Sequence, residues 1–455
     1  MYELVYEHQN EQATKPLVLS LNITCNTEEE TILRNVLENS KLPRTWIKRE
    51  EPHDRIAVIC GSGPSIEDEI ETIRSLWNDG ARVFALNGAA KWLDDHGILA
   101  DYQVIMDARQ ETAGLIGEAT DHLFASQCDP ALFDARPHAI LWHSTHGDVL
   151  VDEQEGFDAK GREYCLIGSS ATVGNTAMTL VHAMGYRTQE IFGMDSSHRG
   201  DRAHVAHQSM NDGDPTMLVK FRDREFLCSF TMKMQAECFK ERAKALQDDG
   251  ATINVHGDGY LPVIWNNPLS EQEKYDAIWR NPSYSECSPG ERIAQTFCEV
   301  CHPTRHSRIA DFGCGSGKGA LAIHGLTGAR VICVDFVEHS RIKEARHFEF
   351  IQSDLSGRQG LPLYAHLGFC ADVMEHIPTD LVGTTIDNVM GACGSCFFQI
   401  STVPDDMGEL IGETLHLTVK PHSWWRDKFC SLGYAVAWER EEETTALFWI
   451  KPLTT

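Results

Sequence analysis

The sequence contains no long hydrophobic run. None of its stretches approaches the roughly 18 consecutive apolar residues that a membrane-spanning helix needs. Residues 1–7 carry neither the basic region nor the apolar region of a secretory signal. We therefore expect a cytoplasmic protein without a membrane span.

Basic residues are also scarce. The chain has 40 lysines and arginines against 67 aspartates and glutamates, a net charge of −27. A field of that sign repels polyanions, so tight nonspecific binding to nucleic acid would need a local basic groove. The charge favours a small-molecule, nucleotide-linked or glycan partner, and nothing in the sequence fixes the oligomeric state.

Internal repeats and low-complexity tracts are absent as well. With 42% hydrophobic and 24% charged residues the composition is that of an ordinary globular protein, and its length suffices for two or three domains. A polar, proline-bearing stretch at 265–273 is the predicted boundary. We divide the chain into an N-terminal extension at residues 1–50 and two domains at residues 51–266 and 267–455. The extension is expected to hold a strand at 17–21 and a helix from Thr27.

Cysteine is plentiful, with 15 residues and no secretory signal, which favours free thiols in a reducing compartment. Residues 298–302 spell a haem-attachment pattern, but that chemistry occurs outside the reducing cytosol. The pairs Cys298/Cys301 and Cys393/Cys396 could share a zinc ion, yet they lie 92 residues apart. We expect core and loop thiols.

The most informative segment is the glycine-rich stretch 311–319, which follows a short apolar run and precedes a helix-compatible one. Its acid and alternating glycines are Asp311, Gly313, Gly315 and Gly317. Alternating glycines allow a strand-to-helix turn to bring bare backbone against a ligand. Asp335 ends the strand-like run 331–334, where a carboxylate can accept hydrogen bonds from both hydroxyls of a ribose. The pattern predicts a nucleotide site at the ends of two neighbouring strands.

These residues resemble motif I of class I S-adenosylmethionine-dependent methyltransferases, in which the opening acid, here Asp311, helps to hold the methionine part of the cofactor. Asp354 occupies the place of an acid near the adenine amino group, and residues 370–378 are similar to the fourth-strand motif of that family. The resemblance covers roughly residues 270–455 and implies a Rossmann-like methyltransferase fold with S-adenosylmethionine as cofactor. The sequence has no Asn/Asp-Pro-Pro-aromatic motif and no Pro-Cys nucleophile, which together with the charge argues against DNA as the substrate.

Methyl transfer from a sulfonium mainly requires that donor and acceptor be held in line. Asp372 and His376 end the fourth strand, where acceptor chemistry usually occurs, and His376 could take a proton from a hydroxyl or amine. Alternatively, Glu375 and His376 cap the following helix. Residues 416–425 interleave polar and aromatic groups and either cover the acceptor or supply core tryptophans.

Strand-like and helix-like segments alternate from Arg55 to about residue 255. The predicted strands are residues 56–60, 83–86, 102–106, 139–142, 190–193 and 251–255. A helix at 232–247 precedes the last of them. Such alternation predicts a second doubly wound α/β domain, with a mostly parallel sheet and ligands at the carboxyl ends of its strands.

Polar residues follow the first two of these strands. The turn after the first contains Gly61, Ser62, Gly63 and Ser65, which would form a phosphate-sized cradle at a helix N-terminus or an ordinary capped turn. Asn87 follows the second strand and could reach a base or sugar, or cap a helix.

Two aspartates follow later strands. Asp107 could hold Mg²⁺ on a diphosphate, and Arg109 could clamp the phosphate. Asp195 could be a second metal or sugar ligand, and a nearby histidine a general base. The candidate histidines are His198, His204 and His207, whose spacing is not that of a helical zinc-ligand pair.

Together these motifs resemble archaeal 6-hydroxymethylpterin diphosphokinases over roughly residues 50–260. Flagellin nonulosonic-acid transferases and, more distantly, bacterial sialyltransferases share the broad pattern. The resemblance also includes residues 142–148 and 168–175, and the segment His146-Gly147-Asp148 is similar to one of the pterin enzymes. It implies diphosphate transfer from ATP with Mg²⁺, although Ala108 stands where the pterin enzymes have a second acid.

We therefore expect two doubly wound Rossmann-like α/β domains that form a bifunctional transferase. The C-terminal domain would be an S-adenosylmethionine-dependent methyltransferase and the N-terminal domain a nucleotide-dependent, diphosphokinase-like transferase. One alternative is an N-terminal glycosyltransferase that uses a CMP-linked sugar, with the methyltransferase modifying the glycan. Another is a non-catalytic nucleotide-binding module.

Overall fold

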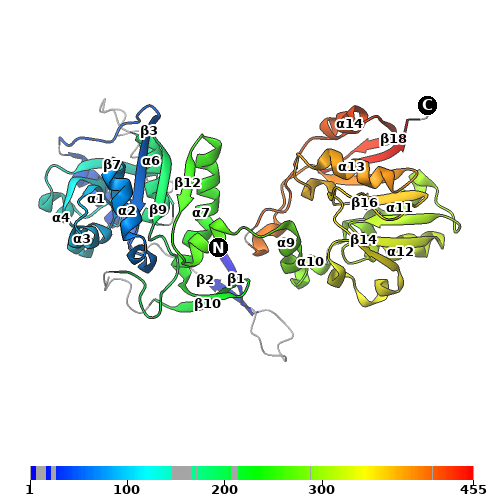
Figure 1. The fold of residues 1–455 in the computed structure, drawn as a ribbon, viewed down its shortest axis with the longest axis horizontal. Helices are drawn as coiled ribbons and strands as arrows, with labels where there is room; N and C mark the ends of the chain where they lie inside the picture. Colours follow the sequence, from blue (N-terminus) through cyan, green and yellow to red (C-terminus); the bar gives the residue numbers. More distant parts are fainter. Residues whose placement is uncertain are drawn as a thin grey trace. The chain divides into compact units, whose positions relative to one another are not determined.

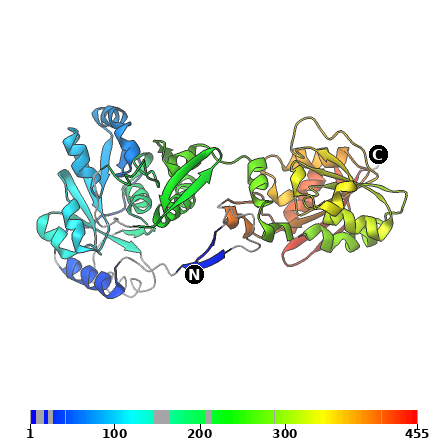
Figure 2. The same cartoon turned by 90° about the horizontal axis from the view of Figure 1, so that it is seen from below.

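The computed structural model describes residues 2–6, 17–21, 27–41, 43–145, 165–170, 172–205, 214–286, 288–411 and 413–453. The chain divides into two compact units, Met1–Pro268 and Leu269–Thr455, and each is described by itself (Figure 1 and Figure 2). No helix in the described part of the chain is long and apolar enough to cross a membrane.

The first unit is built on an eight-stranded sheet in the order β12-β9-β3-β4-β5-β6-β7-β8, in which every pairing is parallel. Its strands are β3 (His53–Cys60), β4 (Arg82–Leu86), β5 (Ala100–Ile105), β6 (Ala119–Ala125), β7 (Ile140–Thr145), β8 (Leu166–Gly168), β9 (Tyr186–Phe192) and β12 (Thr252–Val255). The chain runs outward from β3 to β8 and then returns to the other side of β3 with β9. The carboxyl ends of β3 and β9 are therefore the topological switch point, where ligands bind in doubly wound sheets.

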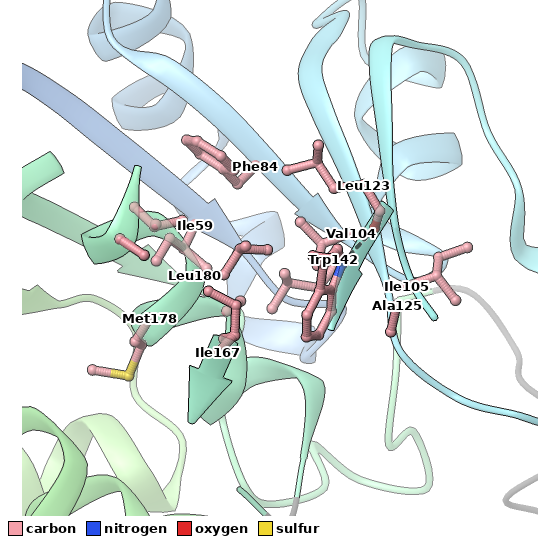
Figure 3. Packing of buried hydrophobic residues seen from close by; sticks show 14 of the residues in the cluster. Ile59, Phe84, Val104, Ile105, Leu123, Ala125, Trp142, Ile167, Met178 and Leu180 are labelled. Carbon is pink, nitrogen blue, oxygen red and sulfur yellow. Dashed lines mark hydrogen bonds between the residues drawn. The ribbon is translucent and has the colours of Figure 1, made fainter. Parts of the chain in front are cut away.

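Helices cover both faces of this sheet. Alternate residues of β3 enter different cores: Ile59 packs with Phe84, Trp142 and Leu180 in one cluster, and Val58 packs in the other. Figure 3 shows the first cluster, in which side chains from the strands meet Met178 and Leu180. The helices in the described part of the unit are α1 (Glu29–Lys41), α2 (Ile70–Asn78), α3 (Ala89–Asp95), α4 (Pro130–Ala135), α6 (Val173–Ala183), α7 (Phe230–Asp248) and α8 (Tyr260–Asn266).

Two antiparallel strand pairs accompany the sheet. The expected strand at 17–21 is β2 (Leu17–Leu21), paired with β1 (Tyr2–Tyr6). The other pair joins β10 (Thr216–Phe221) and β11 (Arg224–Ser229), and its alternating exposure leaves only one side covered.

The second unit has a seven-stranded sheet in the order β15-β14-β13-β16-β17-β19-β18. Its strands are β13 (Arg308–Phe312), β14 (Arg330–Asp335), β15 (Glu349–Gln352), β16 (Leu367–Ala371), β17 (Cys396–Ser401), β18 (Tyr434–Glu441) and β19 (Thr445–Pro452). The first five are parallel, and β19 joins β17 antiparallel. This sheet is also doubly wound, because the chain leaves β13 in both directions.

Helices again cover both faces of the second sheet. Those of one face, α11 (Pro289–Cys301) and α12 (Lys318–Thr327), pack in a cluster with Phe369 and Phe397. Those of the other, α13 (Val382–Gly391) and α14 (His422–Ser431), pack around Phe398. Two short helices, α9 (Glu271–Ile278) and α10 (Pro282–Glu286), precede them. The expected doubly wound α/β class is confirmed for both units.

The cysteines of the described part of the chain are free. Both members of the pair Cys393/Cys396 are buried in the core of the second unit, and Cys301 is buried at the end of α11.

Candidate functional sites

The glycine-rich stretch forms the turn between β13 and α12. Its glycines have positive φ angles: Gly313 (70°), Gly315 (48°) and Gly317 (75°). A Cβ on Gly315 would lie 2.6 Å from a ring atom of Trp279, and one on Gly313 would collide with Val373. The turn therefore needs glycine both for its backbone conformation and for close packing with these side chains. Trp279, which the motif analysis did not single out, follows α9 and lies against the turn.

Asp311 is the buried acid of this turn. Its side chain is 3% exposed and lines a cavity of about 290 Å³ together with the glycine turn, Trp279 and Tyr284. Among the described residues, Oδ2 of Asp311 has no hydrogen-bond partner. Burial, followed by the charge of Asp335, raises the pKa of Asp311 to about 7. An unpartnered carboxylate oxygen beside a cavity favours a cationic ligand group.

Asp335 is the last residue of β14 and is almost fully buried. Oδ2 accepts a hydrogen bond from the backbone N–H of Gly315 at 2.9 Å, and Oδ1 accepts one from Val337 at 2.9 Å. Burial raises the pKa of Asp335, while these backbone donors oppose the shift. Asp335 thus joins the end of β14 to the glycine turn, and each of its oxygens keeps a further lone pair.

Asp354 lies in an exposed turn after β15. Its Oδ1 accepts hydrogen bonds from the backbone N–H and the hydroxyl of Ser356, at 2.8 and 2.7 Å. It does not line the cavity of Asp311. A larger cavity of about 620 Å³ lies beside the ends of β14 and β15 and is lined by Phe336, Val337, Arg341 and Gln352, among others.

The fourth-strand motif follows β16. Asp372, with a φ of 62°, and His376 line the same cavity as Asp311. Glu375 lies between them in a 3-10 turn and is fully buried; its Oε1 accepts a hydrogen bond from Ser401 N–H at 2.6 Å. Burial, followed by the charge of Asp372, raises the pKa of Glu375 well above its usual range.

Burial lowers the pKa of His376 to about 4. Its Nδ1 lies 3.1 Å from the carbonyl oxygen of Leu415, so this neutral ring donates there and turns its Nε2 lone pair elsewhere. An imidazole with so low a pKa is a weak proton acceptor at neutral pH.

The segment 416–425 has two different roles. His416 lines the cavity, and its ring centroid lies 4.7 Å from that of His376. Trp425 is fully buried in the core below α14 and does not reach the cavity. The core-tryptophan interpretation therefore holds for Trp425, whereas cover of the acceptor by this segment stays a prediction.

In the first unit, the turn after β3 meets the turn after β9. Gly63 N–H donates to the Gly193 carbonyl at 2.8 Å, and a Cβ on either Gly61 or Gly63 would collide with that carbonyl. Asp195 is 4% exposed; its Oδ2 accepts from Ser65 N–H at 2.7 Å, and its Oδ1 accepts from the Ser65 hydroxyl. Burial raises the pKa of Asp195. Both oxygens of Asp195 thus already bind Ser65. Ser65 belongs to the turn in which we expected a phosphate.

Ser62 and His204 lie together at the same turn. The Ser62 hydroxyl is 3.1 Å from Nδ1 of His204, and Val205 N–H donates to the Ser62 carbonyl at 2.8 Å. Burial lowers the pKa of His204 to about 4. The candidate His207 and the segment His146-Gly147-Asp148 lie outside the described residues.

Asp107 and Arg109 bind each other. The Arg109 guanidinium contacts both carboxylate oxygens of Asp107, the shorter contact being 2.6 Å, and its backbone N–H donates to Asp107 at 2.9 Å. Asn87 has a φ of 48° after β4, and among the described residues its buried Oδ1 has no hydrogen-bond partner. The expected metal carboxylate is therefore held in an ion pair with the expected phosphate clamp.

Residues 30–201 match the family model described as 6-hydroxymethylpterin diphosphokinase MptE-like, which confirms the resemblance expected for the first unit. The match covers less than half of the chain. No curated protein matches the sequence.

Solved structures similar to the chain include the MAf glycosyltransferase of Magnetospirillum magneticum AMB-1, at 15% identity over 65% of this chain and 49% of that protein, with a TM-score of 0.40. They also include magnesium protoporphyrin IX methyltransferase (ChlM) of Synechocystis PCC 6803 with bound SAM, at 14% identity over 41% of this chain and 99% of that protein, with a TM-score of 0.33. A putative O-methyltransferase of Nostoc punctiforme PCC 73102 matches at 13% identity over 38% of this chain and 59% of that protein, with a TM-score of 0.30.

Proposed function

We propose that the second unit binds S-adenosylmethionine and transfers its methyl group to a small-molecule or glycan acceptor. The observation that carries this proposal is Asp311, a buried carboxylate with an unpartnered oxygen that lines a cavity beside the glycine turn. The methionine part of the cofactor has an ammonium group, which a buried carboxylate of this kind would pair with.

The other residues around the turn fit the rest of the cofactor. Asp335 keeps lone pairs that can accept hydrogen bonds from ribose hydroxyls, while Phe336 and Gln352 line the larger cavity beside it, where an adenine would be bound. When bound, the cofactor supplies a methyl group on a positively charged sulfur. Trp279 and Tyr284 cover the turn side of the cavity and would exclude water from it.

The acceptor would enter the part of the cavity lined by Asp372, His376 and His416. These residues lie in the turn after β16 and in the loop before α14, next to elements anchored in the core. Positioning by such a frame can contribute roughly 7–11 kcal/mol in favourable cases.

Binding of S-adenosylhomocysteine, measured by calorimetry, tests this proposal. We expect saturable binding, weakened about tenfold or more in Asp311→Asn because the charge pair with the ammonium is lost. Asp427→Asn is the matched control, since the Asp427 side chain is 78% exposed. The proposal would be wrong if the unaltered protein bound no S-adenosylhomocysteine at millimolar concentrations, or bound a nicotinamide dinucleotide instead.

For the first unit we propose nucleotide-dependent group transfer at the switch point between β3 and β9. The family match and the packing of the two glycine turns support it. Diphosphate transfer from ATP with Mg²⁺ would require Asp107 to exchange its arginine partner for the metal ion.

One observation favours the glycosyl-transfer alternative. Asp107 is held in an ion pair, and Ala108 stands in place of the second acid of the pterin enzymes. The site therefore has fewer carboxylates than those enzymes to hold a metal-bound diphosphate. A CMP-linked sugar has a single phosphate and makes less demand on a metal. Incubation with ATP and with a CMP-linked sugar separates the cases by product, and nucleotide binding without turnover would identify a non-catalytic module.

A further inference from the structure

Three side chains at the acceptor end of the cavity form a cluster of metal-binding type. One ligand atom from each of Glu375, His376 and His416 lies within 4.8 Å of the others. The first two are adjacent in the turn after β16, and His416 reaches them from the loop before α14. Their chemistry, two imidazoles and one carboxylate, is a common ligand set for divalent transition metals.

The two histidines are oriented as metal ligands are. Nδ1 of His376 lies 3.1 Å from the Leu415 carbonyl, and Nδ1 of His416 lies 2.8 Å from the Val403 carbonyl. A carbonyl oxygen only accepts, so each Nδ1 carries the hydrogen and each Nε2 keeps a lone pair. A backbone partner on the second nitrogen is the usual way in which proteins fix a metal-binding imidazole.

Glu375 supplies an independent observation. Its side chain is fully buried, Oε1 accepts the Ser401 N–H, and Oε2 has no hydrogen-bond donor among the described residues. The adjacent acidic group, Asp372, offers further acceptor oxygens and lines the cavity. Oε2 of Glu375 and the oxygens of Asp372 therefore gather at one place, and a cation would satisfy them together.

The separation of the ligand atoms is compatible with one ion. Two ligand atoms bonded at about 2.1 Å to one metal ion in tetrahedral geometry lie about 3.4 Å apart. The cluster would need to contract by up to about 1.4 Å, which rotation of these side chains can provide.

We infer that Glu375, His376 and His416 bind a divalent transition-metal ion whose open positions face the cavity and take the oxygen of a hydroxyl acceptor. The substrate class in this inference, an alcohol or phenol, rests on the proposed methyl transfer. The metal site itself does not rest on that proposal. The metal would lower the pKa of the bound hydroxyl. Its proton passes to Asp372 and then to water; the oxygen forms a bond to the methyl carbon, and the carbon–sulfur bond breaks with its electron pair on sulfur.

The test titrates the full chain with Co²⁺ after chelator dialysis, following the visible absorption of the bound ion and its displacement by Zn²⁺. We expect one ion per chain, with affinity reduced at least tenfold in His416→Ala and Glu375→Gln. His306→Ala is the control, because His306 lies in an exposed turn before β13. His416 is in a loop, so its variant keeps the test valid if Glu375→Gln unfolds.

Asp311→Asn separates this inference from the proposed function. It should weaken binding of S-adenosylhomocysteine and leave Co²⁺ binding unchanged. Co²⁺ binding that is equal in the unaltered protein and in His416→Ala would overturn the inference. Specific Co²⁺ binding without S-adenosylhomocysteine binding would support the metal site and contradict the methyl transfer.

Discussion

At the residue scale, Asp311 makes the cofactor site dependent on pH. Because its pKa is raised to about 7, the buried carboxyl holds a proton below neutral pH and gives it up above. A cationic ligand pairs with the ionised form. The ligand-free unit loses stability as pH rises from the ordinary carboxyl range to about 7, since the folded state binds the extra proton in that window.

We predict that affinity for S-adenosylhomocysteine falls as the pH is lowered from 8 to 6, by up to about tenfold per unit below the pKa. Calorimetric titrations at several pH values measure it. Asp311→Asn should flatten this part of the profile, while any titration of the ligand itself remains in both proteins. An identical profile in the two proteins would show that Asp311 does not pair with the ligand.

Gly315 is a residue at which the glycine turn depends on close packing. Its φ is 48°, and an added Cβ would lie 2.6 Å from the Trp279 ring. Gly315→Ala should destabilise the second unit by about 1–2 kcal/mol through backbone strain alone, and further by displacing Trp279. Urea unfolding measures the loss.

A double substitution divides the two contributions. Gly315→Ala with Trp279→Ala should recover the steric part and leave the strain. Gly325→Ala in α12 is the control: a Cβ there meets nothing within 4 Å, so it should stabilise the helix by up to about 1 kcal/mol. A neutral Gly315→Ala would contradict the described packing.

The residues that the motif analysis identified differ in what could be predicted about them. Asp311, Asp372 and His376 meet at one cavity because their strand ends meet, which follows from a parallel sheet. The pairing of Asp107 with Arg109 depends on side-chain conformation, which spacing does not encode. The approach of His416 to His376 depends on how a loop 40 residues further along folds back over the strand ends.

At the scale of elements, strands that are buried on both faces could be predicted from the sequence. Their continuous apolar runs, which end at turns, predicted β3, β4 and β9. The strand β6 was missed because Thr120, Asp121 and His122 occupy its first half, and only its second half is a continuous apolar run. The pair β10–β11 was also missed: the exposure of β10 alternates, and its apolar run, residues 217–219, is shorter than those of β3 and β4.

The helix α1 of the N-terminal extension packs against the rest of the first unit. Asn39 is 2% exposed and donates to the carbonyls of Ser126 at 2.9 Å and Cys128 at 2.7 Å. Asn39→Ala should lower the free energy of unfolding of the first unit by about 2–4 kcal/mol, because two buried carbonyls lose their donor. Chemical denaturation measures it. Glu38→Ala, on the exposed side of the same helix, should change stability by less than about 0.5 kcal/mol; equal effects would mean that α1 does not depend on these bonds.

At the scale of the whole molecule, each unit has its own sheet and its own buried clusters, those around Trp142 and Val58 in the first unit and those around Phe398 and Phe369 in the second. Domains of this size with complete cores usually unfold as separate cooperative units. We predict two transitions in differential scanning calorimetry of the full chain.

One ligand and one substitution assign these transitions to the two units. S-adenosylhomocysteine binds only the folded second unit, so at a concentration one hundred times its Kd it should stabilise one transition by about 2.7 kcal/mol. Asn39→Ala should lower the other. If the ligand raised the transition that Asn39→Ala lowers, the cofactor would belong to the first unit and the cavity of Asp311 would have another occupant. Separate responses would show that the two units unfold independently and that S-adenosylhomocysteine binds the second.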